Sequence, residues 1–215
     1  MDKFEIIKNF LLDESVSPEI RRERFDIAWD IWENFPEIQK NIKYKFWERY
    51  LKPEISLLFP HFQIEIASFD IHYFNISLYK TSWLLDTYDK NSRIFNVKLN
   101  RTKNGCFELG LEKWKNIDFL SQHLKALTNE ITIKINKFNK THKDWLFREI
   151  YSEECFTIKQ FLEKLIFNPE NLKNFFIKIF KDLNNFLNTQ LTNEKTVEQT
   201  IEGLAKLARE KYLKS

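Results

Sequence analysis

The first third of the chain carries apolar residues at helical spacing. Phe4, Ile7 and Leu11 lie three to four positions apart and predict a first helix. Ser17-Pro18 predicts the start of a second, because a hydroxyl caps the first N–H groups and proline fits the first helical position. A third helix is predicted over residues 38–51. The apolar face of the second helix is made of Ile20, Ile27, Ala28, Ile31, Trp32 and Phe35.

From about His61 the apolar residues alternate with polar ones, as in half-buried strands. The pattern predicts strands over residues 62–66, 74–78, 95–99 and 107–111. The last two are joined by a segment ending in Asn104-Gly105, a pair typical of hairpin turns. Such short connections favour an antiparallel sheet. Residues 144–151 are ambiguous and are interpreted as a possible fifth, edge strand.

Helical spacing returns after residue 120. One helix is predicted over residues 120–135, and a second starts at a capping box formed by Thr157 and Gln160. A third runs from Asn168-Pro169 to Phe186, and a last one follows a cap at Thr192 or Asn193. The sequence therefore predicts an α+β fold with a central antiparallel sheet of four to five strands, flanked by N-terminal and C-terminal helices. Residues 1–60 and 61–215 are expected to form one compact domain together.

Glycine is scarce, with only three residues in the chain: Gly105, Gly110 and Gly203. Phosphate-binding loops need glycine where the backbone approaches the ligand closely. The chain has neither of the two glycine-rich nucleotide motifs, nor the G-x-S-x-G turn of serine hydrolases. The composition thus argues against nucleotide-dependent and hydrolase chemistry of familiar types.

Histidine and cysteine give no sign of a metal site or a cofactor. The four histidines are scattered, and no Cys-x-x-Cys pair occurs. Cys106 and Cys155 are too few and too far apart for a disulfide framework, which predicts two unpaired thiols in a reducing cytoplasm. No apolar run approaches the ~20 residues of a membrane-spanning helix, so no membrane partner is expected.

Glu108 and Glu112 lie on one face of the fourth predicted strand, next to Lys113. Two acids and a lysine are the residue types of a metal-dependent nuclease, in which the carboxylates hold the metal. The chain, however, contains no Asp/Glu-x-Lys triplet. We interpret the two glutamates as the solvated face of an amphipathic strand.

Residues 71–105 hold six basic against two acidic side chains, a net charge of +4, whereas the whole chain carries +3. This region includes Arg93, Lys98, Arg101 and Lys103, which are candidate phosphate contacts for a nucleic acid. The alternative is an edge hairpin whose charges prevent aggregation.

Six tryptophans are more than the core is expected to bury, and exposed aromatic surface indicates a protein partner or self-association. The last predicted helix adds a second candidate surface. The apolar stripe of this helix has the spacing of a coiled-coil seam. Either it pairs with a partner or a second copy, or it packs back onto its own domain. The candidate partner-binding residues of this stripe are Val197, Ile201, Leu204 and Ala208.

Features between Phe74 and Phe186 resemble the accessory domain of bacterial PD-(D/E)XK nuclease-family proteins. The matching pieces are the Tyr79-Lys80-Thr81-Ser82-Trp83 stretch, an aromatic hairpin, the segment from Trp145 to Arg148 and a closing helix. Such domains lie beside the catalytic core and lack its acidic triad, so the resemblance implies no catalytic residue.

The favoured hypothesis is a non-enzymatic protein-interaction or regulatory module, in bacterial defence or phage counter-defence. The alternative is a nucleic-acid-binding protein or degenerate nuclease relative. An enzyme of unfamiliar type is a third, less favoured interpretation.

Overall fold

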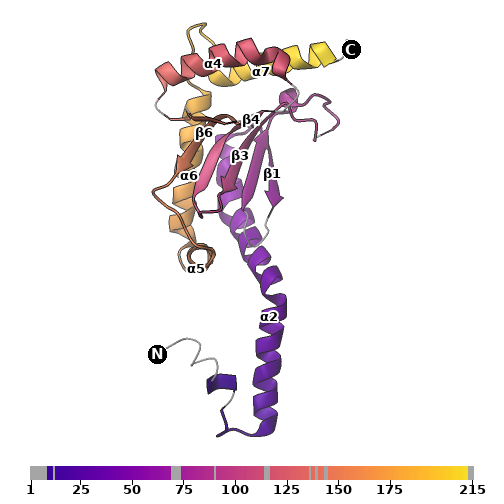
Figure 1. Cartoon of the computed structure of the whole chain (residues 1–215), viewed down its shortest axis with the longest axis vertical. Helices are drawn as coiled ribbons and strands as arrows, with labels where there is room; N and C mark the ends of the chain where they lie inside the picture. Colours follow the sequence, from indigo (N-terminus) through magenta and orange to yellow (C-terminus); the bar gives the residue numbers. More distant parts are fainter. Residues whose placement is uncertain are drawn as a thin grey trace. The chain divides into compact units, whose positions relative to one another are not determined.

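The computed structural model describes residues 9–11, 13–68, 74–89, 91–113, 117–135, 137–138, 140–142 and 145–212 of the 215-residue chain. These fall into two compact units, Met1–Asn41 and Ile42–Ser215, described separately below. The described part of the first unit is mostly helix α2 (Pro18–Phe46), which continues into the second unit (Figure 1). Of the helix predicted over residues 4–11, only residues 9–11 are described, and they are helical.

Helix α2 is continuous where the sequence predicted two helices, so that prediction was wrong. Pro36 lies inside it. A proline in a helix interior removes one N–H donor and usually bends or breaks the helix. The apolar positions before and after Pro36 nevertheless keep one helical phase, because Trp32, Phe35 and Ile42 lie three and seven residues apart. The helical pattern therefore runs through the proline.

The second unit is built on an antiparallel sheet with the strand order β1-β2-β3-β4-β6-β5. The α+β class and the antiparallel sheet are confirmed, with one short strand more than expected. Residues 145–151 form an inner strand between β4 and β5, so their assignment to an edge was wrong. The strands are β1 (Gln63–Ser68), β2 (Asn75–Tyr79), β3 (Phe95–Arg101), β4 (Phe107–Lys113), β5 (Lys140–His142) and β6 (Trp145–Tyr151).

The helices of the second unit cover one face and one end of this sheet. Helix α6 runs beside the sheet, and α4 and α7 lie at one end of it (Figure 1). Short turns of helix, η2 (Thr81–Trp83) and η3 (Asp118–Leu120), precede β3 and α4. The remaining elements are η1 (Trp47–Leu51), α3 (Lys52–Leu58), α4 (Ser121–Lys134), α5 (Ile158–Phe167), α6 (Pro169–Leu187) and α7 (Val197–Tyr212).

A cluster of phenylalanine rings fills the core where β4 meets α5 and α6. Phe107 is fully buried, and its ring centroid lies 4.9 Å from that of Phe176. Three further rings, Phe156, Phe161 and Phe175, lie within 6.4 Å of it. Phe107 can join them because the alternation of β4 points its odd-numbered residues toward the helices. The even-numbered residues of β3 and β4 point to the other, polar face.

Helix α7 closes the core at the end of β2. Its predicted stripe is buried against the rest of the second unit, where α7 packs against η2. Lys80, at the end of β2, forms ion pairs with Glu198 and Glu202 of α7. The cap predicted at Thr192 or Asn193 was wrong. Thr196 and Gln199 instead exchange two backbone-to-side-chain hydrogen bonds at the start of α7.

Candidate functional site

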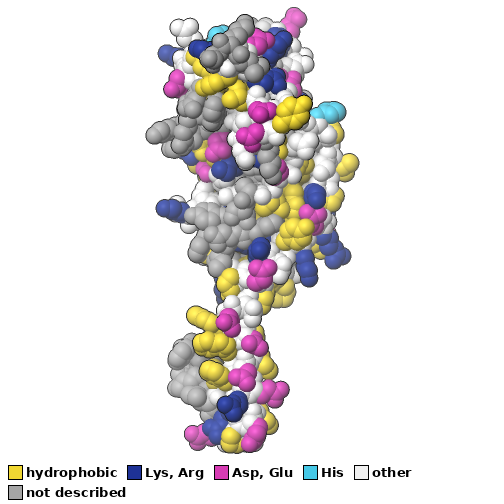
Figure 2. Space-filling model, turned by 90° about the vertical axis from the view of Figure 1, so that its right-hand side faces the viewer, with side chains coloured by type: hydrophobic (Ala, Val, Ile, Leu, Met, Phe, Trp, Pro, Cys, Tyr) yellow, Lys and Arg dark blue, Asp and Glu magenta, His cyan; other side chains and the backbone are white. Residues whose placement is uncertain are grey.

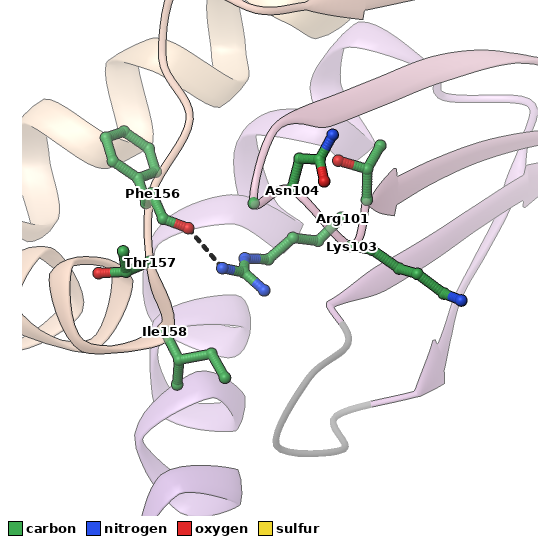
Figure 3. Close-up of a pocket in the computed structure, with 8 residues that line it drawn as sticks. Arg101, Lys103, Asn104, Phe156, Thr157 and Ile158 are labelled. Atoms are coloured by element: carbon green, nitrogen blue, oxygen red, sulfur yellow. Dashed lines mark hydrogen bonds between the residues drawn. The ribbon is translucent and has the colours of Figure 1, made fainter.

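The β3–β4 hairpin forms a pocket of about 360 Å³ with the segment that leads into α5. The turn supplies residues 101–105 and the facing segment residues 156–158 (Figure 3). Backbone hydrogen bonds hold the two sides together, since the N–H of Phe156 donates to the carbonyl of Gly105 at 3.1 Å. Arg101 and Lys103, two of the four predicted nucleic-acid contacts, belong to this pocket.

Arg101 has a structural role in this pocket. Its side chain is buried, and the guanidinium donates a hydrogen bond to the Phe156 carbonyl (Figure 3). It also lies over the Phe161 ring, 5.9 Å from the centroid. Burial lowers the pKa of the guanidinium, because desolvation penalises the charged form. Arg101 thus holds α5 against the hairpin, and its charge is turned away from solvent.

Cys106 and Cys155 form a disulfide across the same junction, with Cα atoms 4.0 Å apart. The prediction of two unpaired thiols was therefore wrong. Antiparallel pairing of β4 with β6 places Phe107 opposite Tyr151, which brings the residues beyond the two strand ends together. The expectation of a reducing compartment rested on unpaired thiols, and the disulfide removes that basis.

Gly105 is required by the close approach of the two sides of the pocket. Its φ is +82°, and a Cβ there would lie 2.0 Å from the Phe156 carbonyl oxygen. We expect Gly105→Ala to lower the free energy of unfolding by at least about 2 kcal/mol in a denaturant titration, because both the left-handed backbone and the contact oppose a side chain.

The matched control is Gly203→Ala in α7, where an added Cβ meets no atom within 4 Å. This change is expected to raise the free energy of unfolding by about 0.5–1 kcal/mol, as alanine favours a helix over glycine. Equal effects of the two substitutions would contradict the close approach.

The other predicted nucleic-acid contacts do not join Arg101 in one basic surface. Arg93 pairs with Glu65 and lies over the Tyr79 ring, 4.1 Å from the centroid. Lys98 is on the polar face of the sheet, with its Nζ 3.4 Å from a carboxylate oxygen of Glu112. Lys103 is exposed in the turn. Two of the four cations are thus already neutralised by carboxylates.

The two glutamates of β4 also differ from the expected solvated face. Glu108 is half-buried, and its carboxylate lies 3.4 Å from an Arg148 guanidinium nitrogen of β6. Asn100 of β3 donates to the same side chain at 3.4 Å. Together with the Lys98–Glu112 pair, these contacts cross-link three strands on the polar face. Glu108 and Glu112 are thus part of a charge-paired surface that fixes strand neighbours.

The stripe predicted as a partner surface on α7 lies in the core. Val197, Ile201 and Ala208 are fully buried, and Leu204 is nearly so. This arrangement matches the alternative in which the helix packs back onto its own domain.

Helix α2 in the first unit exposes a row of aromatic side chains. Along it, Phe25 is 54%, Trp29 55% and Trp32 77% exposed, and Phe35 is 47% exposed. Figure 2 shows hydrophobic side chains along α2, with acidic ones beside them. The rings of Phe25 and Trp29 stack on each other, with centroids 6.1 Å apart. Four exposed isoleucines extend this surface: Ile20, Ile27, Ile31 and Ile38. We call these eight residues the apolar face of α2.

The opposite side of α2 is acidic. Six exposed carboxylates recur at alternating spacings of four and three residues, which places them along one helical stripe. They are Glu19, Glu23, Asp26, Asp30, Glu33 and Glu37.

The sequence pattern identified the apolar stripe of this helix, and the surplus of tryptophans signalled an exposed aromatic surface. The sequence did not show that the exposed aromatic surface belongs to this helix. The seam for a partner was predicted on α7 instead.

Within the described residues, no three or more His, Cys, Asp or Glu side chains gather in a way that could hold a metal ion. None of the described helices has the length and apolarity needed to cross a membrane. No protein-family model, curated protein or solved structure matches this chain. The resemblance to the PD-(D/E)XK accessory domain accordingly stays a prediction.

Proposed function

We propose that the chain is a non-enzymatic protein-interaction module and that the apolar face of α2 is its binding surface. The exposure of four aromatic side chains on one helix carries this proposal. They leave roughly 450 Å² of aromatic surface uncovered, because such a side chain buries about 150–250 Å² when fully enclosed. This is comparable to the largest apolar patch of a typical monomer, which is often functional.

The charges of α2 favour a protein over a nucleic acid or a lipid surface. Helices that lie on membranes carry lysine and arginine on their polar face, which binds anionic lipid. The polar face of α2 instead carries the six carboxylates, which would repel phosphate groups. A partner that covers the apolar face must therefore supply apolar surface of its own.

Nucleic-acid binding, the alternative from the sequence, has weaker support. It required Arg93, Lys98, Arg101 and Lys103 to present their charges together. Arg93 and Lys98 are engaged by glutamates, and Arg101 is buried. Nucleic-acid binding through these residues stays a prediction.

Photo-crosslinking in cells of the native host tests the proposed function. Trp32 is replaced by p-benzoylphenylalanine in the full chain, and in the control the same probe replaces Asp30, which is exposed on the acidic side of α2. Irradiation is expected to give a covalent protein adduct from position 32 and little from position 30. The proposal fails if position 32 gives no adduct, or if both positions give the same ones.

A further inference from the structure

We propose that the occupant of the apolar face is a second copy of this chain, with the two α2 helices antiparallel and related by a two-fold axis level with Asp30. The inference rests on the proposed function, because both use the same face. It adds the identity of the partner and the direction of the pairing.

The first argument is the spacing within the apolar face. Phe25, Ala28, Trp32 and Phe35 follow one another at intervals of three, four and three residues. This is the repeat by which one helix presents a continuous seam to another. The next positions of the repeat are the polar residues Arg21 and Gln39. The apolar seam is therefore confined to residues 25–35.

The second argument is the complementarity of side-chain sizes. In an antiparallel pair centred on residue 30, Trp32 of one copy lies beside Ala28 of the second, and Phe25 lies beside Phe35. Each of the two central layers then combines the largest side chain with one of the smallest, and two phenylalanine pairs close the seam at both ends. Alternation of large and small residues is how facing helices fill the space between them. The seam is thus complementary in shape to the seam of a second copy that runs in the opposite direction.

The third argument is charge. The six carboxylates lie on the side of α2 that points away from the seam, so that two copies pair without bringing like charges together. Arg24 lies next to the seam, and its guanidinium already contacts partners within its own unit. Its guanidinium is 3.1 Å from an Asp13 carboxylate oxygen and lies over the Phe10 ring. No buried charge therefore opposes the pairing along the seam.

The fourth argument is area. Trp29 and Ile31 flank the seam on its two sides, and together with Phe25, Trp32 and Phe35 they leave roughly 500 Å² exposed, taking about 100 Å² for a fully buried aliphatic side chain. A standard protein interface buries about 800 Å² on each partner. The seam and its flanking residues thus supply more than half of what a stable dimer needs.

Sedimentation of the purified full chain gives the first test. We expect a species of about twice the 26.2 kDa of one chain. Trp32→Glu should raise the dimer dissociation constant at least about 30-fold, because it replaces a central aromatic anchor by a charge. Asp30→Lys changes the charge even more, but on the acidic side of α2 that points away from the seam, and should leave the dimer intact. Circular dichroism of both variants verifies that the fold is kept.

Exchanging Ala28 and Trp32 tests whether these two residues face each other across the dimer. Ala28→Trp alone sets tryptophan against tryptophan and should weaken the dimer. Combining it with Trp32→Ala restores one large and one small residue in each layer and should recover much of the affinity. A double variant weaker than both single variants would overturn the proposed layers.

Spin labels attached through Glu19→Cys test the direction of pairing, since both natural cysteines are in a disulfide. In the antiparallel pair residue 19 lies beside residue 41 of the second copy, so the two labels are separated by roughly 33 Å along the helix axis at 1.5 Å per residue. Parallel pairing would leave no separation along the helix axis, so that only the width of the helix pair would separate the labels, and this result would overturn the inference.

The two proposals fail in different ways. A purified chain that stays monomeric, while position 32 crosslinks to another protein in cells, overturns self-association and keeps the interaction module. A monomeric chain without any adduct from position 32 overturns both.

Discussion

Replacing both Cys106 and Cys155 by serine is expected to lower the free energy of unfolding by about 4 kcal/mol, the value that chain-entropy arguments give for a loop of this size. The two residues are 49 positions apart, so the disulfide restricts a long stretch of the unfolded chain. The measurement is a guanidinium titration of the oxidised protein and of the double variant.

Reduced wild-type protein provides the control, because it lacks the same bond without a change of side chain. Its unfolding midpoint should fall close to that of the double variant. A thiol titration of the untreated, unfolded protein should find no free cysteine. Two free thiols, or equal midpoints for oxidised and reduced protein, would contradict the disulfide.

Phe107→Ala should cost about 3–5 kcal/mol, the range for removing a large aromatic side chain from a core. Its ring contacts four other phenylalanine rings across β4, α5 and α6, so the cavity would open where three elements meet. Thermal and denaturant unfolding of the variant would measure the loss.

Phe167→Ala is the matched control for this substitution. Phe167 ends α5 and is 74% exposed, so its truncation should change the free energy of unfolding by no more than about 0.5 kcal/mol. If both variants lost the same stability, the ring cluster would not be the centre of the core.

The sheet could be predicted from the sequence because each of its main strands has one covered and one polar face. The alternation over residues 95–99 and 107–111 matches β3 and β4, and Asn104-Gly105 marks their turn. The inner position of β6 was missed, because sequence alternation reports which residues share a face but not which strand lies beside them. Only the pairing of β4 with β6 settles that order.

The same limit explains the two errors at the candidate sites. Helical spacing showed apolar stripes on α2 and α7 alike, and nothing in the spacing says which stripe the rest of the chain covers. The structure buries Ile201 and leaves Trp32 exposed. The disulfide was missed for a related reason, since Cys106 and Cys155 become neighbours only through strand pairing.

The burial of α7 has a consequence for how the protein is made. Lys80 and its ion-pair partner Glu198 are 118 residues apart, so the end of β2 leaves the ribosome long before the helix that covers it. At a synthesis rate of about 5–20 residues per second, the nascent chain waits roughly 6–24 s with this end uncovered. Trp83 and its neighbours are then open to chaperones and to other nascent chains. The second unit therefore cannot close this end before α7 is synthesised, and a message interrupted before α7 releases a chain with an open core.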